Sequence, residues 1–293
     1  LAGDCVESLR ALDAGSVHCC VTSPPYWGLR DYGEDDQIGL EQTPEAYVEK
    51  LVSVFREVKR LLRDDGTLWL NLGDSYGGSG KGPGKGFNGE QHHLEHKAGR
   101  IVPAGLKPKD LVGIPWRVAF ALQADGWYLR QDIIWSKPNP MPESVTDRCT
   151  KAHEYIFLLS KSAKYYYDAD AIKEPLATEP HASRSDYDQM NKVWGSDGLR
   201  NKRSVWTVTT KPFKGAHFAT FPPDLIEPCI KAGCPKGGTV LDPFGGAGTT
   251  GMVADRLGRS AVLIELNAEY VEIANGRLND DSPLFAQTTF KKE

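Results

Sequence analysis

The sequence lacks long apolar runs and the patterns of zinc-binding or disulfide-linked chains. No stretch of about 18 consecutive apolar residues occurs, so no membrane-spanning helix is expected. The first ten residues, LAGDCVESLR, have neither the basic nor the apolar region of a signal peptide. The six cysteines form no CxxC pair, and no pair of histidines beside them has zinc-ligand spacing. We therefore expect a cytoplasmic protein with reduced, largely buried thiols and no bound metal.

The chain also has little net charge, but its charges are unevenly distributed. The formal net charge of the 293 residues is -4, which argues against a protein that coats nucleic acid indiscriminately. Two segments are nevertheless basic: residues 77–109 carry a net +4 and residues 192–214 a net +5. The first is rich in glycine and lysine and is expected to be mobile. Either segment could contact phosphate groups or simply be solvated.

The second basic segment mixes cations with an aromatic side chain. Arg200, Lys202 and Arg203 precede Trp206 within LRNKRSVW. Cations suit contact with phosphate groups, and an aromatic ring suits stacking on a base. These four residues are candidate nucleic-acid contacts.

Apolar runs and amphipathic stretches alternate along the rest of the chain. Strands are predicted at 17–23, 67–73, 128–137, 154–161, 239–246 and 261–267, and helices at 44–63, 111–126, 226–233, 250–259 and 268–278. Thr43 can cap the first of these helices, Pro44 suits its first position, and Asn267 can cap the last. This alternation predicts an α/β fold with a mostly parallel sheet and helices on both faces.

The motif VLDPFGGAGTT (240–250) follows a strand and opens a helix. Its glycines let the backbone approach a ligand and point helix N–H groups at it. Glu265 ends the next strand, where a carboxylate can bind ribose hydroxyls. Asp242 at the mouth of the turn would repel a pyrophosphate but pair with an ammonium group. The residues favour S-adenosylmethionine over a dinucleotide; an ordinary tight turn with a capping aspartate is the alternative.

The motif TSPPYW (22–27) follows the first predicted strand. Its two prolines have no N–H, so their carbonyls and the Ser23 hydroxyl form a cluster of acceptors. The exocyclic amino group of a nucleobase is a matching donor, and Tyr26 offers a flat face to a base turned out of its stack. A proline-stiffened turn with a packed aromatic residue is the alternative.

With TSPPYW preceding VLDPFGGAGTT along the chain, the two motifs resemble the β-group of DNA amino-methyltransferases, which modify cytosine N4 or adenine N6 with S-adenosylmethionine. Further markers of that family are GDCVESL, GTLWLNLGDSY, IIWSKPNPMPES, EYIFLLSK, HFATFPPDLI and IELNAEY. The resemblance covers about Gly3 to Leu278. It implies a Rossmann-like methyltransferase fold with a small target-recognition insert, double-stranded DNA as partner, base flipping, and a bacterial or phage-type host.

The resemblance also implies a role for each matching residue. Ser23, Pro24, Pro25 and Tyr26 would hold the target amino group and the flipped base. The cofactor residues would be Asp4 for the adenine, Glu265 for the ribose, and Asp242, Pro243, Phe244, Gly245, Gly246, Gly248, Thr249, Thr250, Phe218 and Thr220 for the methionine portion. Asp74, Trp135 and Lys137 are expected near the pocket, either touching the ligands or supporting the site.

By the same resemblance, residues 1–164 are expected to form the catalytic half, which contains the basic loop 75–109 that is expected to be mobile from its composition. Residues 165–215 form the target-recognition region, and residues 216–293 form the cofactor-binding half. That recognition region contains the basic 192–214 segment.

The target base is left open between two candidates. In the family, SPPY mostly accompanies cytosine N4 and DPPY mostly adenine N6, so Ser23 favours cytosine. Adenine N6 is the alternative, and a methyltransferase of RNA or small molecules is a more distant one. No PC dipeptide stands at the catalytic position, which argues against methylation of cytosine C5. A monomer and a homodimer are both compatible with the sequence.

Overall fold

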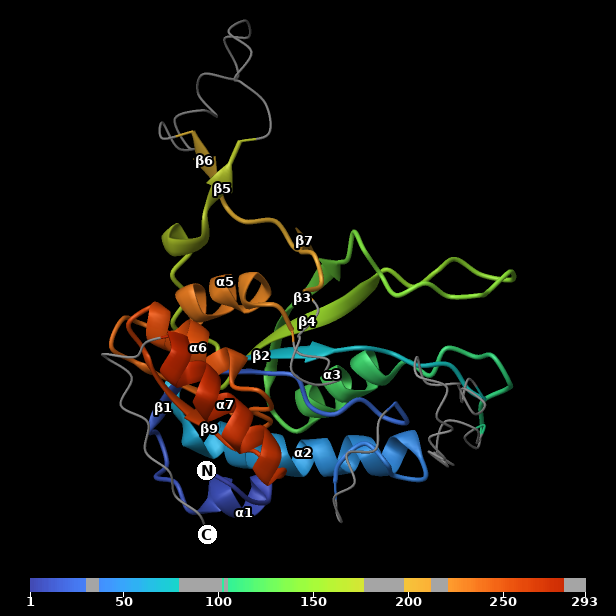
Figure 1. Ribbon diagram of the computed structural model, residues 1–293, viewed down its shortest axis with the longest axis horizontal. Helices are drawn as coiled ribbons and strands as arrows, with labels where there is room; N and C mark the ends of the chain where they lie inside the picture. The colour runs from blue at the N-terminus through green and yellow to red at the C-terminus, as the bar shows by residue number, and fades with distance from the viewer. Residues whose placement is uncertain (30–36, 79–101, 103–104, 177–197, 212–220, 282–293) are drawn as a thin grey trace, which may run out of the picture.

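A seven-stranded sheet with helices on both faces organises the chain (Figure 1). The computed structural model describes residues 1–29, 37–78, 102, 105–176, 198–211 and 221–281. The first half contains α1 (Cys5–Arg10), β1 (Val17–Thr22), α2 (Pro44–Leu61), β2 (Leu62–Leu72), α3 (Ile114–Ala124), β3 (Tyr128–Ser136) and β4 (His153–Ser160). The last part contains α5 (Pro223–Gly233), β8 (Thr239–Asp242), α6 (Thr249–Arg256), β9 (Ser260–Leu263) and α7 (Ala268–Asp281). Between them lie a 3-10 turn η2 (Asp170–Ile172) and the short strands β5 (Glu174–Pro175), β6 (Leu199–Arg200) and β7 (Val205–Thr207).

The sheet has the strand order β7-β3-β4-β2-β1-β8-β9 and is mostly parallel, as predicted. β1 runs parallel to both β2 and β8, β8 runs parallel to β9, and β3 runs parallel to β7. β4 is the exception, because it pairs antiparallel with β2 on one side and with β3 on the other. The beginning of β4 therefore lies at the same edge of the sheet as the carboxyl ends of β1, β2 and β3.

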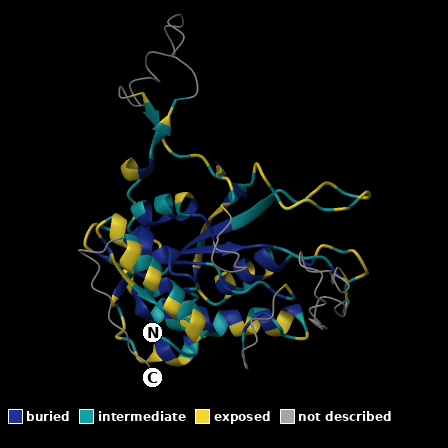
Figure 2. Ribbon diagram, viewed as in Figure 1, coloured by how far each residue is buried: buried dark blue, intermediate teal, exposed yellow. Residues whose placement is uncertain are grey.

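Two apolar clusters cover the two faces of the sheet. Alternate residues of β1 face opposite ways, so Cys20 packs in the cluster of α1, α2 and α3, while Cys19 and Val21 pack in the cluster of α5 and α6. Figure 2 shows the buried residues concentrated in the sheet and on the inward sides of the helices. The expectation of largely buried thiols is confirmed, because five cysteines are buried and Cys149 alone of the six is exposed.

Most predicted elements are present, with shifted ends. Helix α2 is capped by Thr43, whose hydroxyl accepts from the Ala46 N–H at 3.2 Å, and it ends at Leu61. Leu62 then takes extended backbone and pairs with Val17, so β2 begins five residues before the predicted 67–73 strand. The predicted 261–267 strand ends early at Leu263, because the next residues turn toward α7. Helix α1 was not predicted; Asp4 caps it by accepting from two backbone N–H groups.

The short strands after η2 have two different positions. β5 and β6 form a separate antiparallel pair, which projects away from the main sheet (Figure 1). β7 instead joins the edge of the main sheet next to β3. In the ranges that the structure describes, no helix is long and apolar enough to cross a membrane.

Candidate functional site

The carboxyl ends of the neighbouring strands β1 and β8 are joined by one buried carboxylate. Asp242, the last residue of β8, accepts a hydrogen bond from the Thr22 hydroxyl at 2.6 Å and from the Thr250 hydroxyl at 2.6 Å. The Phe244 N–H donates to the same carboxylate at 3.1 Å. Because Thr22 immediately precedes Ser23, this contact places the SPPY motif beside the glycine turn.

The position of Asp242 corrects the expectation that its charge faces a bound ammonium. The Asp242 side chain is only 1% exposed. Both of its oxygens already accept hydrogen bonds from the hydroxyls of Thr22 and Thr250. Burial raises the pKa of Asp242, although the hydrogen bonds from Thr22 and Thr250 oppose that shift. Asp242 thus links the SPPY turn to the glycine turn through buried hydrogen bonds.

The glycine turn is fastened to the end of β9. The Gly245 N–H donates to the Ile264 carbonyl at 2.7 Å, and the Gly246 N–H donates to the Glu265 carboxylate at 2.8 Å. Gly248 caps helix α6 at φ 78°, and a Cβ there would lie 2.9 Å from the Ala274 Cβ. Only glycine allows this backbone and this close approach of α7. Burial raises the pKa of Glu265, whose other oxygen accepts from the Asn267 N–H at 2.9 Å and whose side chain stays partly exposed.

Asp4 is brought to this same region by the first residues of the chain. Leu1 and Gly3 bond to the backbone of residues 263–265, so the N-terminal segment runs alongside the end of β9. Asp4 follows directly and is partly exposed. The structure therefore gathers three of the segments predicted to bind the cofactor: residues 1–4, the glycine turn and Glu265. Phe218 and Thr220 lie outside the described residues.

The SPPY motif forms the turn after β1. The Tyr47 hydroxyl of α2 donates to the Pro25 carbonyl at 2.8 Å, and Pro24 is buried. Among the described residues no group donates to the Pro24 carbonyl. The Tyr26 ring packs on the backbone of Gly73, where a Cβ would lie 2.5 Å from the ring carbon Cε2. The turn is therefore held from both sides, with the Pro24 carbonyl left as an acceptor.

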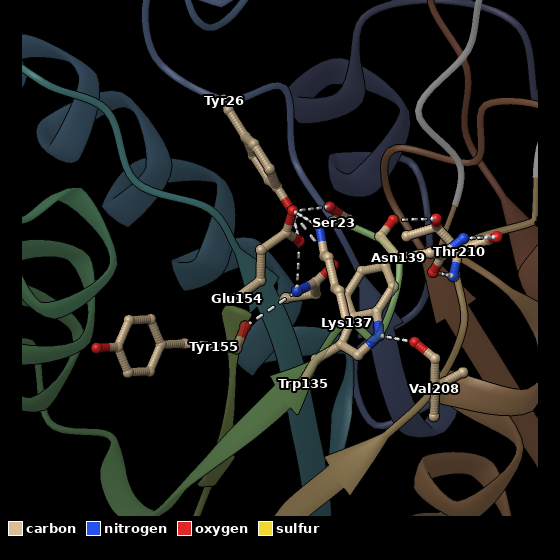
Figure 3. A network of polar contacts seen from close by, with 10 residues as sticks. Ser23, Tyr26, Trp135, Lys137, Asn139, Glu154, Tyr155, Val208 and Thr210 are labelled. Atoms are coloured by element: carbon tan, nitrogen blue, oxygen red, sulfur yellow. Dashed lines mark hydrogen bonds and ion pairs between the residues drawn. The ribbon is translucent and has the colours of Figure 1, made fainter. Parts of the chain in front are cut away.

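The Tyr26 hydroxyl connects Ser23 to a carboxylate on β4 (Figure 3). The Ser23 hydroxyl donates to the Tyr26 hydroxyl at 3.3 Å. The Tyr26 hydroxyl in turn donates to Glu154 Oε2 at 2.7 Å. Asn71 of β2 also donates to Glu154 Oε2, at 3.3 Å. The Lys137 ammonium pairs with the other oxygen, Oε1, of Glu154. Burial and the charge of Glu154 raise the pKa of Tyr26 well above its usual value, so the phenol stays protonated.

The structure resolves the positions of the three residues left open by the sequence. Lys137 lies 4.2 Å from the ring centroid of Trp135, whose indole N–H donates to the Val208 carbonyl at 2.8 Å. Trp135 is buried and supports the site from below. Asp74 accepts from the backbone N–H groups of Gly113 and Ile114 at 3.0 Å each, and so fixes the start of α3.

Glu154 is the residue that sequence reasoning missed. Ligands of parallel sheets bind beyond the carboxyl ends of the strands, so candidate residues are expected there and not at strand beginnings. Glu154 stands instead near the beginning of β4, opposite Trp135 in the register of β3. It reaches the site because β4 runs antiparallel, and a polar residue at the start of an apolar strand was the available signal.

The candidate DNA-binding residues occupy different environments. Arg200 and Arg203 both donate to Glu174, at 3.1 and 2.8 Å, and their side chains are 18% and 65% exposed. Burial raises the pKa of Glu174, but the two guanidinium groups lower it to a net value below the usual one. Lys202 lies over the Trp206 ring, 5.1 Å from its centroid.

Trp206 is not placed to stack on a nucleobase. It is 5% exposed within β7, its indole N–H donates to the Arg203 carbonyl at 2.7 Å, and it packs in the apolar cluster of α5 and α6. Its ring is a core element that anchors the basic segment to the sheet. The expectation of a stacking contact from Trp206 is therefore corrected.

Comparison with known proteins gives a consistent picture. A family model described as DNA methylase matches residues 17–276. The chain is 52% identical over 282 residues to the Type II methyltransferase M.Cfr9I of Citrobacter freundii, a match that covers 95% of this chain and 87% of that protein. It is 51% identical over 279 residues to the Type II methyltransferase M.SmaI of Serratia marcescens, covering 95% of this chain and 89% of that protein.

Solved structures share the fold. TTHA0409 of Thermus thermophilus, assigned as a DNA modification methylase and solved with S-adenosyl-L-methionine, superposes with a TM-score of 0.61. It is 26% identical, and the match covers 97% of this chain and 95% of that one. The cytosine-N4-specific PvuII DNA methyltransferase superposes with a TM-score of 0.67 at 20% identity, covering 99% of this chain and 86% of that one. With its family model, relatives and strand-end motifs in agreement, the chain belongs to the DNA methylase family of N4- and N6-directed enzymes and is a DNA methyltransferase.

Proposed function

We propose that this protein transfers a methyl group from S-adenosylmethionine to the N4 amino group of cytosine in double-stranded DNA. The observation that carries the proposal is the 2.6 Å bond between Thr22 and Asp242, which sets the SPPY turn next to the glycine turn. The SPPY turn supplies acceptors for an amino group, and the glycine turn suits a nucleoside cofactor. Both lie at the carboxyl ends of neighbouring parallel strands, where ligands of such sheets bind.

The residues at the glycine turn fit S-adenosylmethionine. A Cβ at Gly246 would meet nothing nearer than 3.9 Å, so the turn leaves open space on that side. The Glu265 carboxylate suits the ribose hydroxyls, and Asp4 beside it suits the adenine. When bound, this cofactor supplies the electrophilic methyl group. With Asp242 closed off, the methionine ammonium would depend on other acceptors of the turn.

The chain's own residues would hold the target base. The Ser23 hydroxyl and the Pro24 carbonyl accept hydrogen bonds from the amino group, which frees the nitrogen lone pair from ring conjugation. Tyr26 stacks on the extruded base, whose release from the duplex costs a few kcal/mol. These residues act by positioning and by placing acceptors where charge develops.

The choice of cytosine rests on Ser23. In the family that the sequence resembles, a neutral hydroxyl at this position mostly accompanies cytosine N4, whereas the adenine-directed members mostly carry an aspartate there. Adenine N6 is the second candidate, since either amino group can donate to the same acceptors. Residues 165–215 would supply target recognition, with Arg200, Lys202 and Arg203 contacting phosphate groups.

The product identifies the target base. Duplex plasmid DNA from a methylation-deficient host is incubated with the protein and S-adenosylmethionine, digested to nucleosides, and analysed by mass spectrometry. N4-methylcytosine is expected, and its yield is strongly reduced by Ser23→Ala. N6-methyladenine as sole product would overturn the cytosine assignment, and unmodified DNA would overturn the proposed reaction.

A further inference from the structure

Glu154 is a partly buried carboxylate whose ion pair with Lys137 is a weak source of stability. Its side chain is 16% exposed and that of its partner Lys137 is 17% exposed. Desolvation of two such charges largely offsets their attraction, so a buried ion pair contributes little net stability. Glu154 nevertheless also accepts from Tyr26 and Asn71, which places its charge next to the SPPY turn.

The directions of the hydrogen bonds form an ordered chain. A hydroxyl has one proton to donate, and the Tyr26 hydroxyl has two acceptors in reach, Glu154 Oε2 at 2.7 Å and Asn71 Oδ1 at 3.2 Å. The shorter bond to the charged oxygen takes the proton, because a charge-assisted hydrogen bond is the stronger one. The Tyr26 oxygen can then accept the Ser23 proton, at 3.3 Å. With its own proton directed at Tyr26, the Ser23 oxygen offers only lone pairs to an incoming amino group.

We propose that Glu154 is a positioning residue which, through Tyr26, orients Ser23 as an acceptor and receives the proton released by the target amino group. This inference rests on the proposed methyl transfer. It assigns to Glu154 the negative charge that Ser23 itself lacks. The carboxylate acts from two hydrogen bonds away instead of touching the base.

The step balances in atoms and charge. The nitrogen electron pair forms the new bond to carbon, and the pair of the broken carbon–sulfur bond stays on the thioether. The methylated nitrogen then carries one proton too many. That proton passes to the Ser23 oxygen, the Ser23 proton passes to Tyr26, and the Tyr26 proton passes to Glu154 Oε2. The product amine and both hydroxyls end neutral, and the protonated Glu154 later returns its proton to water.

Two single substitutions interrupt this chain at different links. Glu154→Gln keeps an amide oxygen to accept from Tyr26 but cannot take up a proton. Tyr26→Phe keeps the aromatic ring but removes the link. Each is expected to lower the single-turnover rate of methyl transfer to plasmid DNA by about 100-fold, the usual contribution of a proton acceptor. The double variant should be no slower than the slower single variant, because both break one pathway.

Further readouts separate this role from a structural one. The affinity of both variants for S-adenosylmethionine, measured by calorimetry, should change less than about threefold, since neither substitution alters a group assigned to hold the cofactor. The affinity of Glu154→Gln for plasmid DNA should change as little, because Glu154 does not touch the base. Ser23→Asp added to Glu154→Gln should restore at least about tenfold of the lost rate, because it puts a carboxylate directly at the acceptor position. An unfolded variant could not show this rescue. Glu57→Gln, which breaks the partly buried pair with Arg60 on α2, is the matched control and should keep the full rate.

The outcomes are distinct. Glu154→Gln within threefold of the wild-type rate, losses that multiply in the double variant, or no rescue by Ser23→Asp would each overturn the role of Glu154. In all three cases the wild type still methylates DNA, so the proposed function stands. A wild type that transfers no methyl group would refute the proposed function itself.

Discussion

The contact that unites the two halves of the site can be tested through the stability of the fold. Thr22→Val and Thr250→Val each replace a hydroxyl by a methyl group and remove one 2.6 Å hydrogen bond to Asp242. A hydrogen bond to a charged group contributes about 1.5–3 kcal/mol. The Asp242 side chain is 1% exposed, so water cannot replace the lost donor. Each variant should therefore lower the free energy of unfolding by about 2 kcal/mol.

The same variants in an Asp242→Asn background show whether the charge is responsible. A hydrogen bond between neutral groups contributes about 1 kcal/mol, so Thr250→Val should cost about half as much there. Urea unfolding at pH 7, followed by circular dichroism, measures the loss of unfolding free energy for both variants in both backgrounds, four losses in all. Equal losses in both backgrounds, or a loss below about 0.5 kcal/mol with Asp242 present, would refute the reasoning.

Three further predictions follow from burial, charge and close contacts. Gly73→Ala should slow methyl transfer by about 100-fold, because the added Cβ displaces the Tyr26 ring. Gly276→Ala is the control, since no atom lies within 4 Å of its Cβ, and equal rates of the two variants would contradict this prediction. Because burial raises the pKa of Glu265 above 4.5, the wild type should lose unfolding free energy relative to Glu265→Gln as pH rises from 4.5 through the folded-state pKa; a flat difference in urea titrations would count against it. Trp206→Ala should destabilise the fold by about 3 kcal/mol in thermal melts, because its ring is buried. Arg203→Ala should leave stability nearly unchanged and weaken DNA binding in a salt-dependent manner, because its side chain is largely exposed. The reverse pattern would identify Trp206 as a DNA contact.

The parts of the site that could be predicted from sequence are those fixed by local backbone rules. Glycines after a strand, and two prolines after another, dictate turns whatever lies around them, and both turns were placed at strand ends. The environment of Asp242 could not be read in this way, because the hydroxyls that enclose it come from Thr22 and Thr250. A carboxylate beside glycines looks the same in sequence whether it faces solvent or core.

The direction of β4 and the burial of Trp206 could not be predicted from the sequence for similar reasons. The apolar pattern of β4 is the same in either direction, so the arrival of Glu154 at the site depends on pairing with β2 and β3. Trp206 looked like a stacking residue because cations precede it, yet its three-residue strand adds to the sheet edge and turns the ring inward. Both outcomes are decided by long-range packing.

The bond between Thr22 and Asp242 also has a consequence for biosynthesis. Its two partners are 220 residues apart, and β1 lies between β2 and β8 within the sheet. While the chain is being synthesised, β2 can pair with β1 early, but the other edge of β1 has no neighbour until β8 emerges. An unpaired apolar strand edge invites pairing with other chains, and contacts of such long sequence separation form slowly. The nascent chain is therefore expected to be most prone to aggregate just before β8 emerges, and to become competent for methyl transfer only once β8 has docked against β1.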